Sequence, residues 1–242
     1  LSRVIQGEYA RYFDFVPPDL ACTDTAAIRA AVLEAVSGTK YAHNTRQRMM
    51  TRIRSVFRFG IDEGWLSVNP IHKDMVPEYQ HAVPRPYTDE QISRISLLSD
   101  SSKFKAYLLF LAGSACRPVE GLRLEWEHVH SDHCVVYSYK NGRRSARFRV
   151  IPFEICPMVE LAIDMARSQS RNETGLVFGL RNYVNASRKF NELQEEGEGR
   201  GLYGIRKWRI NKWKRDGMPP TVRHAIAGHD EDIAETYYET DY

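Results

Sequence analysis

A proline-containing stretch at residues 73–87 constrains the fold of this chain most, because it separates two long segments of helical periodicity. It carries three prolines and several charges, and it shows little apolar periodicity of its own. Such a composition is typical of a linker between domains. The sequence therefore predicts a small helical domain with its linker over residues 1–84 and a larger domain over residues 85–242.

Helical periodicity dominates the first domain. Asp24 predicts a helix that Gly38 ends, and Asn44 or Thr45 opens a second helix that runs to Gly64. Five arginines decorate this second helix with no acidic residue among them. That clustering favours contact with phosphates over an ordinary solvated face. These candidate DNA-binding residues are Arg46, Arg48, Arg52, Arg54 and Arg58.

The second domain combines helices with one short sheet. Thr88 begins a capping box that opens its first helix. Residues 134–139 and 146–152 are rich in β-branched and aromatic side chains, and Asn141-Gly142 lies between them. Asn-Gly between two such runs is the strongest short-range signal for a β-hairpin. The predicted fold class is therefore mainly α (α+β), a helical domain followed by a helical domain with a small antiparallel sheet.

Composition indicates the class of protein and its cellular compartment more clearly than its function. The chain has 43% hydrophobic and 27% charged residues with a net charge of +3, which describes a globular protein with a mild preference for polyanions. Its four cysteines form no Cys-x-x-Cys pair, which argues against a zinc ribbon and favours a reducing, cytosolic compartment. No apolar run is long enough to span a membrane. The first residue is Leu, so we expect a fragment from which an N-terminal module is missing.

The most specific pattern is a set of spacings in the last forty residues. Arg206 is followed by Gly217 after eleven residues and by Gly228-His229 after twenty-three. Tyr238 comes nine residues beyond His229.

Two upstream segments extend this pattern. The stretch Gly113–Leu122 contains Arg117 with the carboxylate Glu120 three residues later, and Lys140-Asn141-Gly142 occupies the tip of the predicted hairpin. Taken alone, Lys140 at a hairpin tip or His229 before a helix would be a solvated or capping side chain. The agreement of all the spacings is what favours a functional role.

The complete pattern resembles the tyrosine recombinases, the phage-integrase family. In that family an arginine lies in a Thr-Gly-x-Arg-x-x-Glu-Leu segment, a lysine lies on a β-hairpin, and a second arginine precedes Gly-His and the tyrosine. The resemblance covers residues 88–242 well. It covers residues 1–80 more loosely, as a helical core-binding domain that ends in a Trp-Leu-x-x-Asn-Pro segment. It implies a site-specific DNA recombinase, an integrase that cleaves and rejoins DNA through a 3′-phosphotyrosine intermediate.

The resemblance implies a role for each matching residue. Arg117 and Arg206 would clamp the phosphate, and His229 would donate a hydrogen bond to it. Lys140 would protonate the leaving 5′ oxygen, and Tyr238 would be the nucleophile. Because arginines supply the positive charge, no metal or other cofactor is expected.

Three further positions belong to the expected site. Glu120 would orient a neighbouring cation, while Arg143 and Arg144 beside the hairpin tip would contact backbone phosphates. Tyr203 stands where the family usually has a histidine, three residues before the second arginine. A tyrosine hydroxyl can donate a hydrogen bond but is a poor base at neutral pH, so either this position is tolerant or the enzyme is slowed.

The family also implies partners and a biological setting. We expect double-stranded DNA with an att-type core site, a homotetramer on that DNA, an accessory DNA-bending protein, and integration of a viral genome or prophage in the cytoplasm of a bacterial host. Only four residues follow Tyr238, which suggests truncation or a different assembly contact. Two alternatives stay open, a type IB topoisomerase and a DNA-binding relative with impaired catalysis.

Overall fold

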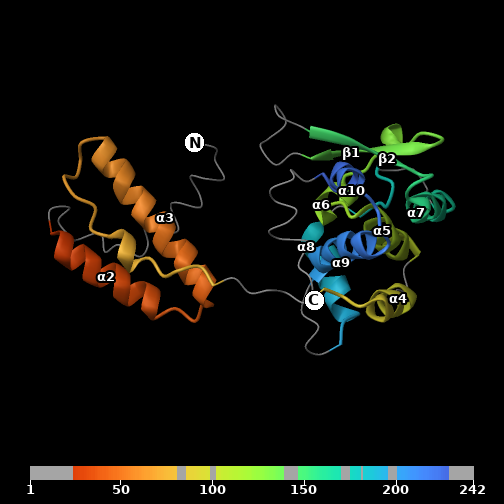
Figure 1. The fold of residues 1–242 in the computed structure, drawn as a ribbon. Helices are drawn as coiled ribbons and strands as arrows, with labels where there is room; N and C mark the ends of the chain where they lie inside the picture. Colours follow the sequence, from red (N-terminus) through yellow and green to blue (C-terminus); the bar gives the residue numbers. More distant parts are fainter. Residues whose placement is uncertain are drawn as a thin grey trace. The chain divides into compact units, whose positions relative to one another are not determined.

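The computed structural model describes residues 24–80, 86–98, 102–138, 147–169, 175–180, 182–195 and 201–228. The chain divides into two compact units, Leu1–Val83 and Pro84–Tyr242. Figure 1 shows that both units are built from helices and that the sheet of the described residues lies in the second. The mainly helical fold class with a small antiparallel sheet is confirmed.

In the described part of the first unit, two long helices are followed by a short 3-10 turn. α2 (Thr25–Ser37) is capped by Asp24, whose Oδ1 accepts from the backbone N–H of Ala27 at 2.9 Å, as the sequence predicts. α3 (His43–Asp62) packs against α2, and η1 (Lys73–Met75) follows. The hydrophobic core cluster of the described residues in this unit consists of Ile28, Val32, Val36, Met49, Met50, Ile53, Phe57 and Ile71.

The start of α3 differs from the prediction. The helix begins at His43 after Ala42, and no side chain caps it. Asn44 does not cap, because its side-chain amide is engaged with the backbone of Gln80. It donates to the Gln80 carbonyl at 2.7 Å and accepts from the Gln80 N–H at 2.9 Å. The Asn44 side chain, which the local sequence predicts as the helix cap, is therefore used in a tertiary contact with Gln80.

The segment after α3 folds back along the helix. Leu66 packs closely on Gly60, where an added Cβ would lie 3.2 Å from Leu66 Cδ1. The Asn69 side chain donates to the Arg54 carbonyl at 3.0 Å and accepts from the Ile71 N–H at 3.0 Å. Asn69 thus satisfies backbone groups on both the helix and the returning chain.

The second unit is organised around a buried central helix, α5 (Ser102–Ser114). It packs against α4, α6, α7 and α9. Gly113 allows its closest approach, since an added Cβ would lie 2.9 Å from Val159 Cγ2 and 3.0 Å from the Val159 nitrogen on α7. The other elements are α4 (Asp89–Leu98), α6 (Pro118–Leu122), η2 (Trp126–His128), β1 (His133–Ser138), β2 (Arg147–Pro152), α7 (Pro157–Arg167), α8 (Tyr183–Glu192), α9 (Gly201–Arg215) and α10 (Pro220–Ala227).

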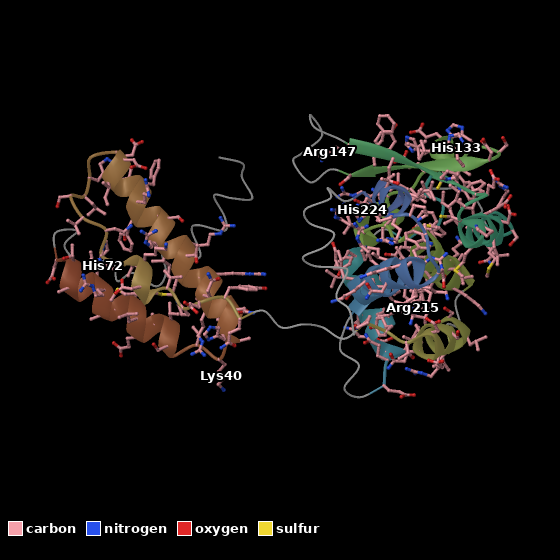
Figure 2. The ribbon with its side chains drawn as sticks, in the orientation of Figure 1. Lys40, His72, His133, Arg147, Arg215 and His224 are labelled. Carbon is pink, nitrogen blue, oxygen red and sulfur yellow. The ribbon has the colours of Figure 1, made fainter. Side chains whose placement is uncertain are left out.

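β1 and β2 form an antiparallel pair with His133 opposite Pro152 and Ser138 opposite Arg147. The predicted pairing of these two segments is confirmed. The predicted turn at Asn141-Gly142 lies outside the described residues. Figure 2 shows His133 and Arg147 at opposite ends of the sheet, and Figure 1 shows α10 beside it, in agreement with the contacts between α10 and β2.

The predicted capping box at the start of α4 is also confirmed. The Thr88 N–H donates to Gln91 Oε1 at 2.9 Å, and the Gln91 N–H donates to Thr88 Oγ1 at 3.2 Å. Among the helices of the described residues, none combines the length and apolar character needed to cross a bilayer.

Candidate functional site

The site is built on the sharp turn that joins α5 to α6. Ser114 ends α5, and its hydroxyl donates to the Phe110 carbonyl at 2.7 Å and accepts from the Cys116 N–H at 3.2 Å. Ala115 is buried and has φ 50°, a left-handed conformation that costs a non-glycine residue about 1–2 kcal/mol. Strain of this kind is often retained where it aims a functional side chain. Here it delivers Arg117 to the N-cap position of α6.

The conformation of Ala115 corrects the register of the sequence match. In the Thr-Gly-x-Arg pattern the glycine stands two residues before the arginine, and that position is Ala115 rather than Gly113. The structure gives the two residues separate tasks. Ala115 adopts the backbone that favours glycine, while Gly113 allows α5 to approach α7.

Glu120 anchors Arg117 in two ways. Its Oε2 accepts from the Arg117 backbone N–H at 2.8 Å, and its Oε1 accepts from Arg117 Nη1 at 3.0 Å. A second arginine, Arg149 on β2, donates from Nη2 to Glu120 Oε2 at 2.6 Å. Glu120 is only 6% exposed, so one buried carboxylate holds two guanidinium groups.

The electrostatic state of Glu120 follows from these contacts. Burial acts to raise the pKa of Glu120. The charge and hydrogen bond of Arg149, together with the contacts from Arg117, outweigh burial and place the pKa below its ordinary value of 4.5. The carboxylate is therefore ionised at neutral pH. Burial raises the pKa of the adjacent Cys116 to about 11, so this thiol stays protonated and is not a nucleophile.

Arg206 reaches the same turn from α9. It is 1% exposed, and its Nη1 donates to the carbonyl of Ala115, two residues before Arg117. The sequence separates Arg117 and Arg206 by 89 positions, yet the fold brings both to one short segment of backbone. Tyr203 lies one helical turn before Arg206, and its ring is half-exposed.

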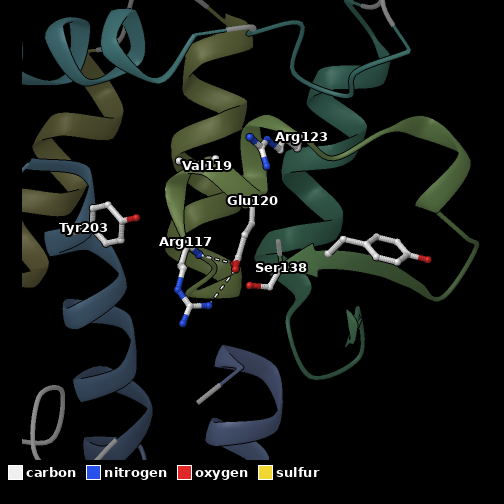
Figure 3. A pocket seen from close by; sticks show the side chains of 7 residues that line it. Arg117, Val119, Glu120, Arg123, Ser138 and Tyr203 are labelled. Carbon is white, nitrogen blue, oxygen red and sulfur yellow. Dashed lines mark hydrogen bonds and ion pairs between the residues drawn. The ribbon is translucent and has the colours of Figure 1, made fainter. Parts of the chain in front are cut away.

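A pocket of about 170 Å³ opens beside this turn. Figure 3 shows Arg117 and Glu120 between Tyr203 on one side and Ser138 on the other. Guanidinium and hydroxyl groups make up most of the polar lining of the pocket. Such donors match the oxygens of an anion such as phosphate. The lining residues are Arg117, Val119, Glu120, Arg123, Tyr137, Ser138 and Tyr203.

Buried basic side chains outnumber buried acidic ones among the described residues of the second unit. Among the described residues, Glu120 is the buried acid, whereas several basic side chains on β2, α9 and α10 are at least nine-tenths buried. Among them, Arg149 is held by Glu120 and Arg206 by the Ala115 carbonyl, so two of these cations are fixed at the turn that carries Arg117. The buried basic residues are Arg149, Arg206, Lys207, Arg209, Arg223 and His224.

Five of the expected residues, Lys140, Arg143, Arg144, His229 and Tyr238, lie outside the described part of the chain. Two of these residues lie within two positions of the described part of the chain. Ser138, which lines the pocket, is two residues before Lys140, and Gly228 directly precedes His229.

The arginines of α3 belong to the first unit. Arg48 and Arg52 are four residues apart and share one face, as do Arg54 and Arg58. The two pairs are turned by about 120° from each other at the ordinary helical pitch. Arg48, Arg52 and Arg58 are exposed, while Arg46 and Arg54 are half-buried. The helix therefore presents basic side chains on two faces outside its core stripe.

One group among the described residues has the composition of a metal site. Glu125, Glu127 and His128 place ligand atoms within 4.8 Å of one another near η2. Both glutamates are exposed, and none of the three lines the pocket beside Arg117.

Sequence reasoning missed Arg149. A signal was present in the strand, since Arg149 alternates with Phe148 and Val150 and falls on the same side as Ile151. Both Arg149 and Ile151 are buried, whereas Phe148 and Val150 are exposed. An arginine on the inward side of a strand requires a partner, and here the partner is Glu120.

The chain as a whole matches no protein-family model. No curated protein sequence matches it.

Solved structures do match. A lambda integrase dimer bound to a COC′ core site matches with a TM-score of 0.76 and 13% identity, over 100% of this chain and 75% of that one. A lambda integrase tetramer bound to a Holliday junction gives 0.75 and 11%, over 100% and 74%. The Tn1549 transposon integrase in complex with circular intermediate DNA gives 0.73 and 14%, over 100% and 91%. The chain therefore has the fold of these integrases.

Proposed function

We propose that this chain is a tyrosine recombinase, an integrase that cleaves and rejoins double-stranded DNA at specific sites through a 3′-phosphotyrosine intermediate. One observation carries the proposal. In a fold shared with DNA-bound integrases, Arg117 and Arg206 converge on a single turn beside a pocket rich in hydrogen-bond donors. The spacing of His229 and Tyr238 after Arg206 adds support from the sequence.

The reaction follows from the charges that develop on phosphorus. The Tyr238 oxygen attacks the phosphodiester, a P–O bond to tyrosine forms, and the P–O bond to the 5′ oxygen breaks. Lys140 supplies the proton to that departing oxygen as a general acid. Arg117 and Arg206 bind the non-bridging oxygens, whose negative charge grows in the transition state, and His229 adds a further donor.

The second half of the reaction needs no external energy source. The phosphotyrosine keeps the energy of the phosphodiester, so a 5′ hydroxyl from either strand can attack it. This attack releases Tyr238 and restores a DNA backbone. The arginines supply the positive charge that a metal ion would bring in other phosphoryl-transfer sites.

Tyr203 modifies this scheme. It lines the pocket beside Arg117, where its hydroxyl can donate a hydrogen bond to a phosphate oxygen. The phenol is a poor base at neutral pH, because its pKa is ordinarily about 10. The proton of Tyr238 therefore passes to water instead of to a histidine base at this position, and cleavage is slower than in a recombinase that has one.

The DNA partner and assembly are proposed by analogy with the structural neighbours. Those neighbours are integrases bound to core-site and circular-intermediate DNA, including a tetramer on a Holliday junction. For this chain we expect an att-type core site, with α3 contacting backbone phosphates from the first unit. A homotetramer, an accessory bending protein and a location on DNA in a bacterial host complete the proposal.

A pool of nicked duplexes tests the proposal without knowledge of the target sequence. Each duplex carries randomised flanks and a nick placed so that the short fragment with the freed 5′ hydroxyl diffuses away and the covalent complex is trapped. The wild-type protein should retain selected duplexes after denaturation, and Tyr238→Phe should retain none. Equal retention by the two proteins would overturn the proposal.

The same protein and duplex pool distinguish the recombinase from the two alternative functions. A type IB topoisomerase would form adducts with little sequence preference and relax supercoiled plasmid as a monomer. A DNA-binding relative without catalysis would enrich duplexes in a filter-binding assay and form no adduct. The proposed recombinase enriches a defined core sequence, forms the adduct on it, and exchanges strands between two such duplexes.

A further inference from the structure

Arg149 is a buried cation whose contacts join two parts of the candidate site. It extends from the inward side of β2 and is 9% exposed. Its Nη2 donates to Glu120 Oε2 at 2.6 Å, and its Nε donates to the carbonyl of Ile226 at 2.8 Å. A single guanidinium therefore contacts the carboxylate that holds Arg117 and the last turn of α10.

The second contact holds the last turn of α10. The carbonyls of a final helical turn lack partners inside the helix, and a cation there is also favoured by the helix dipole. After Ile226 the chain turns through Gly228, which has φ +69°. An added Cβ at Gly228 would lie 3.1 Å from both Cδ and Nη1 of Arg149. The position before His229 thus rests directly on the Arg149 side chain.

The first contact determines how much positive charge Arg117 offers to a ligand. Glu120 carries one negative charge, and two arginines share it. The trio keeps a net charge of +1. Without Arg149, Arg117 and Glu120 would form a neutral pair, and the carboxylate would hold the Arg117 guanidinium more tightly.

We infer that Arg149 is a positioning residue, which leaves the charge of Arg117 available to the scissile phosphate and fixes the end of α10 relative to it. The inference rests on the proposed DNA cleavage. Arg149 acts through Arg117 and α10, so it governs the rate of cleavage and contributes little to DNA affinity.

The first test compares Arg149→Met and Arg149→Lys with Arg167→Met, an exposed arginine on α7 in the same unit. Cleavage is measured in single turnover on duplexes selected by the wild-type protein, and DNA affinity is measured on the same duplexes. Arg149→Met should cleave about 100-fold more slowly, the effect expected if Arg117 no longer acts as a pre-organised donor. Its DNA affinity should change less than threefold. Arg149→Lys keeps the charge and should recover part of the rate, and Arg167→Met should match the wild type.

A neutral substrate provides a readout that a purely structural role would not change. Replacing one non-bridging oxygen of the scissile phosphate with a methyl group removes its negative charge. If Arg149 acts by freeing Arg117 for that charge, the penalty of Arg149→Met should fall below tenfold on the methylphosphonate duplex. An equal penalty on both duplexes, or a loss of DNA affinity that matches the loss of rate, would overturn the inference.

A pair of glycines tests the geometry with Arg149 intact. Gly228→Ala places a methyl group against Arg149, whereas Gly217 has φ +78° with no atom within 4 Å of an added Cβ. Both substitutions meet the same backbone strain, but only Gly228→Ala should slow cleavage, by about tenfold or more. Equal rates for the two variants would contradict the role of Arg149 at α10. If the wild type forms no adduct, the proposed function fails, and the inference fails with it; a wild-type adduct with an unimpaired Arg149→Met refutes the inference alone.

Discussion

Replacement of Glu120 by glutamine should strongly lower the free energy of unfolding of the second unit at neutral pH. Three donors converge on this side chain, namely the Arg117 N–H, Arg117 Nη1 and Arg149 Nη2. Glutamine keeps only one acceptor oxygen, so at least one donor loses its partner whichever way the amide turns. Two of the three contacts share Oε2, and the amide oxygen should take that place, leaving its NH₂ group against Arg117 Nη1.

The magnitude follows from the lost charge and the lost hydrogen bond. A hydrogen bond to a charged group is worth about 1.5–3 kcal/mol. Removal of one partner from a buried ion pair costs about 3–5 kcal/mol, and the Arg149 side chain is 8% exposed. Because glutamine preserves two of the three contacts, the expected loss in the free energy of unfolding at pH 7 is about 3 kcal/mol.

The pH dependence has a definite sign. The pKa of Glu120 lies below its ordinary value of 4.5 in the folded chain. The ionised carboxylate therefore stabilises the fold above about pH 4.5, and this contribution is lost as the pH falls through the folded pKa. Glutamine does not titrate. The difference between wild type and Glu120→Gln should be largest near pH 7 and should shrink below about pH 4.5.

Urea unfolding followed by tryptophan fluorescence measures this difference, since Trp126, Trp208 and Trp213 all lie in the second unit. Glu160→Gln, an exposed position on α7, is the matched control and should change stability by less than about 0.5 kcal/mol. The reasoning is refuted if Glu120→Gln behaves like this control at pH 7. It is also refuted if the difference stays constant as the pH is lowered.

Three further outcomes are expected. Ala115→Gly should raise the free energy of unfolding by about 0.5–1 kcal/mol in thermal or urea unfolding, because relief of left-handed strain exceeds the entropy that glycine adds to the unfolded chain. Arg52→Ala and Arg54→Ala should each reduce the slope of log affinity against log salt by about 1 in DNA-binding titrations, because each removes one phosphate contact. Tyr203→His should accelerate adduct formation near pH 7 by about 100-fold, because an imidazole is the better base, whereas Tyr203→Phe should slow it.

The first two outcomes have matched controls, and the third has a result that would contradict it. Ala112→Gly lies inside α5 and should destabilise, in contrast to Ala115→Gly. Lys73→Ala removes a cation of the first unit outside α3 and should leave the salt slope unchanged. A rate for Tyr203→His no higher than the wild-type rate would show that proton transfer at this position does not limit cleavage.

Local sequence signals predicted much of the fold because they depend on near neighbours. The cap at Asp24, the capping box at Thr88 and the pairing of the two strands all rest on short-range chemistry, and all are confirmed. The predicted start of α3 was wrong, because it depends on a contact with a residue distant in the sequence. Asn44 is a good cap by itself, but a contact with Gln80, distant in sequence, uses its side chain.

The candidate site shows the same limit. Spacing identified Arg117 and Arg206, and the fold brings both to the Ala115 turn. The Thr-Gly-x-Arg pattern has its glycine at the position of Ala115, but the alanine itself gives no local sign of the left-handed conformation found there. Arg149 escaped notice because its importance comes from Glu120 and Ile226, which lie 29 and 77 residues away in the chain.

Mapping the covalent bond tests the central proposal most directly. Tyr237 and Tyr238 are adjacent, and on a helix their side chains would point about 100° apart, so only one can be the nucleophile. Adducts trapped on the nicked duplex pool would be digested with protease and nuclease, and the modified peptide sequenced by mass spectrometry. We predict a nucleotide linked through its 3′ phosphate to Tyr238, with Tyr237→Phe still forming the adduct. A nucleotide on Tyr237, a 5′ linkage, or an adduct that survives Tyr238→Phe would contradict it.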